Sequence, residues 1–143
     1  MLIIGYGNPL RGDDGLGWHA AEALRALPGA DVITTHQLTP ELAEEASRTA
    51  LVIFLDAAET GVPGEWRRRE VVETAPTSAA FTHHVTPGSL LAAARLLYGH
   101  APRAVLFTMT GERFDFHEGL SETVAAVLPG MLRAVREAAG CAT

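Results

Sequence analysis

The segment ALVIFLD, residues 50–56, constrains the fold most, because six apolar residues in a row end abruptly in an aspartate. A run this short and this apolar is typical of a strand that is buried on both faces. Such strands belong to parallel sheets with helices packed on each side. The segment therefore predicts an α/β fold with Ala50–Leu55 at the centre of the sheet.

The rest of the chain alternates strand-like and helix-like patterns, which favours consecutive β-α units. The segment at 65–72 follows Asp56 too closely for a helical crossover, so we expect it to be antiparallel. The prediction is a three-layer αβα sandwich with a mostly parallel, mixed five-stranded sheet, in a single domain spanning 1–143. Strands are expected at 1–6, 31–36, 50–55, 65–72 and 104–109, and helices at 17–27, 40–47, 87–98 and 121–139.

Proline and capping residues locate several helix ends. Thr39-Pro40 and Thr86-Pro87 each place a cap before a proline at the first helical position. Gly99 ends the second of these helices. Ser121 is the expected cap of the last helix, in which Pro129 should either kink the helix or split it at Leu128.

Composition excludes several function classes. The net charge is −6, and all eleven basic residues are arginines, so nucleic acid is not an expected partner and lysine chemistry is ruled out. No apolar run is long enough for membrane insertion, and the N-terminus lacks a basic leader, so we expect a cytoplasmic protein. One cysteine, Cys141, allows neither an internal disulfide nor a cysteine-rich zinc site.

Two further sequence features need an interpretation. Gly5-Tyr6-Gly7 follows a strand, but Leu10 stands where a dinucleotide-binding fingerprint needs its third glycine, so these glycines are expected to form a tight turn. The triplet Arg67-Arg68-Arg69 lies along a predicted strand, so that Arg67 and Arg69 share one face. That face is expected to be solvated, and contact with an acidic partner is the alternative.

Three residues are candidate metal ligands: Asp14, Asp56 and His84. Taken singly, each has a structural explanation, since Asp13 and Asp14 could cap a helix, Asp56 could form an Asx-turn and His83 with His84 could be a solvated pair. If the first and third strands are neighbours, however, the loops after them meet at one sheet edge. Two carboxylates and an imidazole suit nickel, zinc, iron or cobalt and leave a coordination position open.

No serine or cysteine offers a convincing nucleophile. The chain has no GxSxG elbow, its serines at 47, 89 and 121 fall at predicted helices, and Cys141 lies near the chain end. Carboxylate, imidazole and metal chemistry is therefore what the sequence supports.

At these residues the chain resembles the hydrogenase maturation endopeptidases, which process the large subunit of nickel-iron hydrogenases. The resemblance covers nearly the whole length through GYGNPLRGDDGLG, VIFLDAAETGVPG, HHVTPGSLLAAARLLYG and GERFDFHEGLSETV. It implies that Asp14, Asp56 and His84 are the metal-binding and catalytic residues, with His83 as the alternative histidine.

The resemblance also implies a function. The enzyme would remove a C-terminal extension from the nickel-iron hydrogenase large-subunit precursor after nickel insertion, using the nickel carried by the substrate as its recognition element. Zinc, cadmium or another divalent metal could occupy the site in isolation, and the enzyme would be a monomer. A metal-dependent hydrolase of another peptide and a non-catalytic nickel-binding chaperone are the alternatives.

Two more segments bear on the substrate. His36-Gln37 follows the second predicted strand, where the two side chains could contact the substrate tail or serve only the strand end. Phe114 and Phe116 flank Asp115, with His117 following, and are expected to pack into the protein rather than shape a substrate groove.

Overall fold

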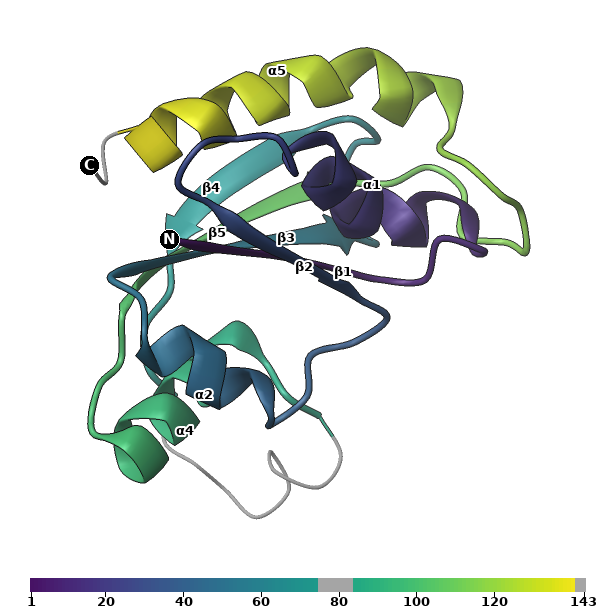
Figure 1. The fold of residues 1–143 in the computed structure, drawn as a ribbon. Coiled ribbons are helices and arrows are strands. Elements are labelled where there is room, and N and C mark those ends of the chain that lie inside the picture. Colours follow the sequence, from purple (N-terminus) through teal and green to yellow (C-terminus); the bar gives the residue numbers. More distant parts are fainter. Residues whose placement is uncertain (75–83, 141–143) are drawn as a thin grey trace.

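The computed structural model describes residues 1–74 and 84–140, and it contains the expected mixed sheet (Figure 1). The sheet has five strands in the order β2-β1-β3-β5-β4. All neighbouring strands are parallel except β4, which pairs antiparallel with β5. The strands are β1 (Leu2–Tyr6), β2 (Asp31–Thr35), β3 (Leu51–Ala58), β4 (Trp66–Glu70) and β5 (Arg103–Thr110).

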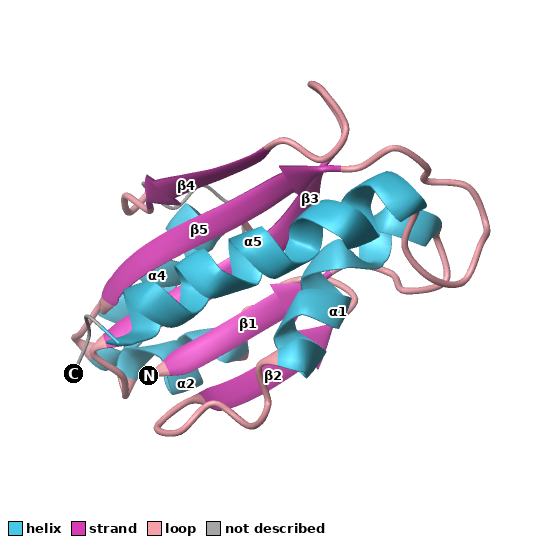
Figure 2. Cartoon of the chain, turned by 90° about the horizontal axis from the view of Figure 1, so that it is seen from above, coloured by secondary structure: helices cyan, strands magenta, loops and turns pink. Residues whose placement is uncertain are grey.

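Helices cover both faces of this sheet, which confirms the predicted α/β sandwich (Figures 1 and 2). α1 (Leu16–Ala23) and α5 (Glu122–Gly140) pack on one face, and α2 (Leu42–Ser47) and α4 (Pro87–Tyr98) pack on the other. Successive residues of β3 alternate between two apolar clusters: Ile53 and Leu55 join α1 and α5, whereas Val52 and Phe54 join α2 and α4. Among the described helices, none combines the length and apolar character that crossing a membrane requires.

The strand order places a topological switch point beside β1. The chain leaves β1 to form β2 on one side, and later returns to form β3 on the other. β1 and β3 are paired only as far as Gly5, which lies opposite Leu55. Ligands bind in open α/β sheets where such connections diverge at the carboxyl ends of the strands. The prediction that the first and third strands are neighbours in the sheet is therefore confirmed.

The two threonine-proline signatures behave differently. Thr86 caps α4: its side chain accepts a hydrogen bond from the Ser89 amide, the Ser89 hydroxyl oxygen accepts one from the Thr86 amide, and Gly99 closes the helix at φ 80°. Thr39 does not cap α2, which begins only at Leu42. The prediction was wrong there because the chain from Thr39 forms turns of the 3-10 type before the α-helix begins. In the first of these turns the Leu42 amide donates a hydrogen bond to the Thr39 carbonyl oxygen.

Pro129 neither ends nor divides the last helix, since α5 continues through it over 19 residues. Proline cannot donate a hydrogen bond to the carbonyl group of Ala125 one turn earlier. Both Ala125 and Pro129 lie on the exposed side of α5, where water can satisfy that carbonyl group. The opposite side remains anchored in the core by Val124, Met131, Leu132, Val135 and Ala139.

A glycine allows α1 to lie close against the sheet. A Cβ atom at Gly17 would stand 2.1 Å from the Leu55 carbonyl oxygen and 2.7 Å from that of Tyr6. Both neighbours are backbone atoms of the two strands that flank the switch point, so they cannot rotate away. The position of α1, and with it the turn after β1, therefore requires glycine at position 17.

We predict that Gly17→Ala destabilises the protein by about 3 kcal/mol, because overpacking against fixed backbone outweighs the better helix propensity of alanine. The matched control is Gly130→Ala in α5, where an added Cβ would meet nothing within 4 Å. That variant should be stabilised by up to about 1 kcal/mol. Urea unfolding followed by circular dichroism measures both changes, and equal effects of the two substitutions would contradict the close-packing argument.

Candidate active site

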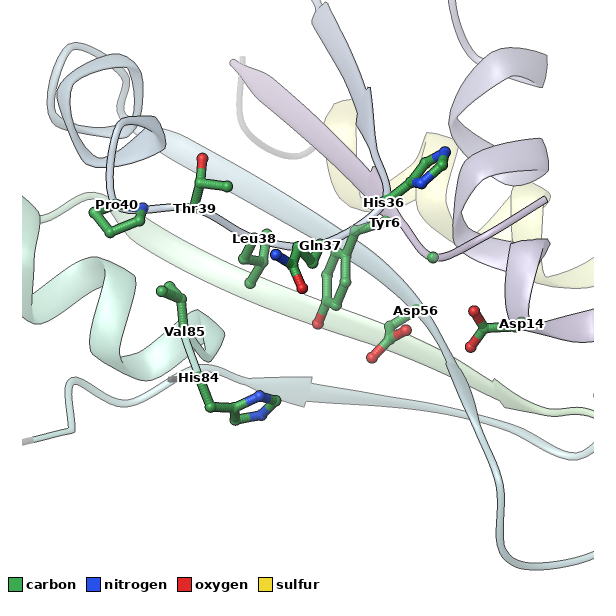
Figure 3. A pocket seen from close by; sticks show the side chains of 11 residues that line it. Tyr6, Asp14, His36, Gln37, Leu38, Thr39, Pro40, Asp56, His84 and Val85 are labelled. Atoms are coloured by element: carbon green, nitrogen blue, oxygen red, sulfur yellow. The ribbon is translucent and has the colours of Figure 1, made fainter. Parts of the chain in front are cut away.

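A cavity of about 290 Å³ opens at the switch point, and all three candidate residues, Asp14, Asp56 and His84, line it (Figure 3). Its walls come from the end of β1, Asp56 of β3, the 3-10 helix η1 (Gly12–Gly15), the segment after β2 and the residues before α4. The other lining residues are Tyr6, Gly7, His36, Gln37, Leu38, Thr39, Pro40 and Val85.

Asp56 lies within β3 rather than at its end, which corrects the sequence-based boundary. β3 continues to Ala58 because its pairing with β5 persists, with Asp56 opposite Thr108. By alternation the Asp56 side chain points to the same face as Val52 and Phe54. It is nevertheless at the switch point, since pairing with β1 has already ended at Leu55.

The pKa of the Asp56 carboxyl group lies close to neutral pH. Burial raises its pKa to about 6, although hydrogen bonds from the Ala57 amide and the Tyr6 hydroxyl oppose the rise, while the charges of Asp14 and Glu59 add to it. The Ala57 amide nitrogen lies 2.8 Å from Asp56 Oδ1. The group is therefore held in one orientation and is desolvated, as a residue with an acid-base function would be.

Tyr6 is a site residue that the sequence analysis did not identify. Burial raises the pKa of its hydroxyl, and the charge of Asp56 and the hydrogen bond to it raise the pKa further, against the opposing charge of Arg69. Tyr6 therefore stays protonated and serves as a hydrogen-bond donor toward Asp56. The alternation of Leu2, Ile4 and Tyr6 along β1 was the available signal, because it places Tyr6 on the same face as Asp56.

Asp14 is positioned by the turn that follows β1. Its carboxylate accepts a hydrogen bond from the Asn8 amide at 2.9 Å, and the Asn8 side chain in turn accepts one from the Leu10 amide at 2.9 Å. Gly7 has φ 139° and lies so close to the Asp14 carbonyl group that a Cβ would stand 1.9 Å from its oxygen. Gly7 thus forms the predicted tight turn, which brings Asp14 to the cavity. Gly5 does not belong to this turn, because it lies within β1, where a Cβ would stand 2.1 Å from the Gly17 carbonyl oxygen of α1.

Asp13 has a separate, structural role. It is fully buried, and its carboxylate accepts hydrogen bonds from the amides of Glu112, Arg113 and Ser121 and from the Ser121 hydroxyl. Burial alone would raise its pKa, but these hydrogen bonds more than offset it and keep the pKa below its ordinary value. Asp13 does not cap its own helix. It joins the turn after β1 to the chain that leads into α5, where Ser121 also caps the Val124 amide as expected.

The two carboxylates lie together, and the histidine stands apart from them. Asp14 and Asp56 are near enough for the Asp14 charge to raise the pKa of Asp56. His84 is exposed and lies beyond Asp56 as seen from Asp14 (Figure 3). Within 1–74 and 84–140, no three His, Cys, Asp or Glu side chains are grouped closely enough to hold a metal ion. His83 and Cys141 lie outside the described residues.

Other predicted contacts divide between the cavity and the surface. His36 and Gln37 line the cavity, and His36 packs edge-on against Trp18 of α1 with ring centroids 5.5 Å apart.

Phe114 packs over Gly111 as expected. Phe116 does not pack, because 84% of it is exposed, and the expectation for this residue was wrong. The loop at 113–117 is held through backbone bonds to the turn after β1, which require no buried side chain at Phe116.

We predict that Asp56→Asn stabilises the protein at high pH. The folded chain binds a proton at Asp56 more tightly than the unfolded chain does, so the cost of the buried charge grows as pH rises from about 4 to about 6 and is complete above that range. The variant should be more stable than the parent by about 3 kcal/mol at pH 8, and by less than about 1 kcal/mol at pH 4.

Urea unfolding of parent and variant at the two pH values measures this difference. Asp13 also titrates on acid unfolding, but it is present in both proteins, so its contribution cancels. A stability difference that does not change with pH would show that Asp56 is not held in the desolvated environment described above.

Comparisons with known proteins show what the whole chain is similar to. No protein-family model and no curated protein sequence matches the chain. Solved structures do match. The hydrogenase maturating endopeptidase HybD from E. coli has 26% identity and a TM-score of 0.74, with 94% of this chain and 88% of that chain covered. The hydrogenase 2 maturation peptidase from a Thaumarchaeota archaeon has 26% identity and a TM-score of 0.70, with 97% of each chain covered.

A third structure, the [NiFe] hydrogenase maturation protease HybD from Thermococcus kodakarensis, has 20% identity and a TM-score of 0.74 over 99% of this chain and 98% of that one, and shows the shared fold. These similarities extend over most of each chain. The chain is therefore similar, over nearly its whole length, to solved hydrogenase maturation endopeptidases, which are peptidases.

Proposed function

We propose that this protein is the endopeptidase that removes the C-terminal extension of a nickel-iron hydrogenase large-subunit precursor after nickel has been inserted. The observation that carries the proposal is the cavity at the switch point, where Asp14, Asp56 and His84 all contribute to one surface. The fold around it is that of solved structures named as maturation endopeptidases. The expected setting is the cytoplasm, with the enzyme acting as a monomer.

Nickel in this proposal belongs to the substrate. A resident metal would need its protein ligands gathered in advance, yet among the described residues no three ligand-type side chains are so gathered. Asp14 and Asp56 already face the same space, and His84 borders it from the segment before α4 (Figure 3). A nickel ion arriving with its own substrate ligands needs only a partial set of protein ligands. The metal would then identify precursor that is ready for cleavage.

The side chains of the cavity suit peptide hydrolysis. With a pKa of about 6, Asp56 is mostly ionised at neutral pH and can accept a proton from the attacking water. Tyr6 and the Ala57 amide hold its carboxylate in place during that transfer. Asp14 is the alternative base, and polarisation of the scissile carbonyl group by the nickel is an alternative route to the same activation.

Cleavage of a defined precursor tests the proposal. The protein is incubated with nickel-loaded and with nickel-free large-subunit precursor, and the precursor mass is read by mass spectrometry. We expect shortening of the loaded form only, because the metal completes the binding site. Asp56→Asn should lower the rate of shortening at least about hundredfold, as expected for loss of a general base.

The other outcomes are informative. Absence of shortening of the loaded precursor would contradict the peptidase proposal and favour a nickel-binding chaperone. Shortening of both forms would leave a peptidase without nickel as its recognition element. Cleavage of an unrelated peptide in preference to the precursor would indicate a hydrolase with a different substrate.

Metal binding distinguishes the adjacent aspartates. Asp14→Asn, Asp56→Asn and His84→Ala should each weaken nickel binding about tenfold or more in isothermal titration, without loss of folding, because all three lie at the cavity surface. Asp13→Asn should instead destabilise the protein by about 3 kcal/mol, since an amide cannot accept all four hydrogen bonds at this buried position. Unchanged nickel binding in the first three folded variants would refute the ligand assignment.

A further inference from the structure

A second cavity, of about 230 Å³, lies on the same face of the sheet as the first. Its lining comes from the end of β3, from β4 and β5 and from the turn that joins β3 to β4. The lining residues are Ala58, Thr60, Gly61, Glu65, Arg67, Thr108 and Thr110. None of these residues was assigned a role by the sequence except Arg67, as part of the arginine triplet.

The strand register connects the two cavities. Asp56 of the first cavity is the direct partner of Thr108, and Thr108 is the direct partner of Arg67. Alternation along each strand places these three side chains on the face covered by α2 and α4, because Phe54 and Leu106, two residues earlier, belong to that apolar cluster. The second cavity therefore lies beside the first on this face of the sheet, from β3 across β5 to the edge strand β4.

The dimensions fit an extended peptide. The path from Asp56 to Arg67 crosses two strand spacings, or about 10 Å. An extended chain covers that distance in about three residues. Thr108 lies midway along this path, and its hydroxyl makes no hydrogen bond to another described residue, so it can bond to a peptide backbone that crosses the strand.

The charges change sign along this path. Arg67 and Arg69 point to the cavity face, whereas Arg68 points to the opposite face and pairs with Glu70. Arg67 is paired with Glu65 at 2.6 Å. Arg69 has no ion pair within the part of the chain that the structure describes, and its charge reaches Tyr6. The β4 end thus holds two guanidinium groups against one carboxylate, while the other end holds Asp14 and Asp56.

We propose that the peptide substrate lies extended across β3, β5 and β4, and that Arg67 and Arg69 bind a carboxylate group of the substrate at the β4 end. This inference rests on the proposed peptidase function and adds a subsite to it. The carboxylate belongs either to an acidic side chain near the scissile bond or to the end of the chain, and both offer the planar pair of oxygens that a guanidinium group binds.

The test compares two changes of charge on one strand. The double variant Arg67→Gln/Arg69→Gln removes the cations that face the cavity, and its matched control, Arg68→Gln, removes the cation on the opposite face. With nickel-loaded precursor, the double variant should raise KM about tenfold and leave kcat within about twofold, because a charge-assisted contact to the bound tail is lost. The control should change neither constant by more than about twofold.

Changes in the substrate identify the carboxylate. One precursor has the acidic residues of its tail replaced by their amides. If the enzyme binds an acidic side chain, the parent enzyme should have a higher KM for this precursor than for the unchanged one, whereas the KM of the double variant should be the same for both. A second precursor carries a neutral Gly-Ser-Gly addition at its C-terminus. If the enzyme binds the terminal carboxylate, this second precursor should be the one for which the parent enzyme has a higher KM and the double variant an unchanged KM. A parent enzyme that responds to neither change contradicts the proposal.

Binding is measured separately from cleavage, by the fluorescence anisotropy of a labelled 12-residue peptide that carries the tail sequence of the same precursor. Weaker binding to the double variant than to Arg68→Gln supports the subsite even if the parent enzyme cleaves no precursor, in which case the peptidase function alone fails. Equal peptide binding by the parent, the double variant and the control overturns the subsite even if the precursor is cleaved normally.

Discussion

The divergence of the chain beyond the β1–β3 pair is the constraint on which the rest of the site depends. These two strands are paired through Gly5 and Leu55, after which β1 turns away and β3 continues with β5. A parallel pair cannot be closed by a short turn, so each strand must leave the sheet edge by its own connection. The space between the two departing connections is the cavity that Asp14 and Asp56 share.

Two carboxylates of this protein, Asp13 and Asp56, have opposite effects on its stability. Asp13 accepts four hydrogen bonds and holds together segments that are about a hundred residues apart in the sequence. Its charge is therefore satisfied, and it stabilises the fold. Asp56 is desolvated with fewer compensating bonds, so its charge is costly to the fold and available for chemistry. The stability that α1, α5 and Asp13 provide offsets the cost of the desolvated Asp56 charge at the switch point.

Local patterns predicted the layers of the fold, the antiparallel β4 and the capped helix α4, because alternation, apolar runs and capping chemistry act over a few residues. They failed where the decisive contact is distant. The end of β3 depends on β5, whose pairing carries the strand past Asp56 to Ala58. At Pro129 the pattern left a kink or a split open, and the absence of a split in α5 depends on which side of the helix faces water. Exposure of Phe116 depends on backbone bonds between two loops.

The sequence by itself determined which residues could carry the chemistry, since GYGNPLRGDDGLG places carboxylates in the turn after a buried strand and ALVIFLD ends an apolar run in a carboxylate. Only the tertiary structure separated Asp13 from Asp14, because the partners of Asp13 lie near the start of α5. It alone showed that Tyr6 donates to Asp56 and that Arg67 lies in line with Asp56 across β5. Residue identity is a local property, whereas the neighbours that set a pKa or extend a cavity come from strands that only folding brings together.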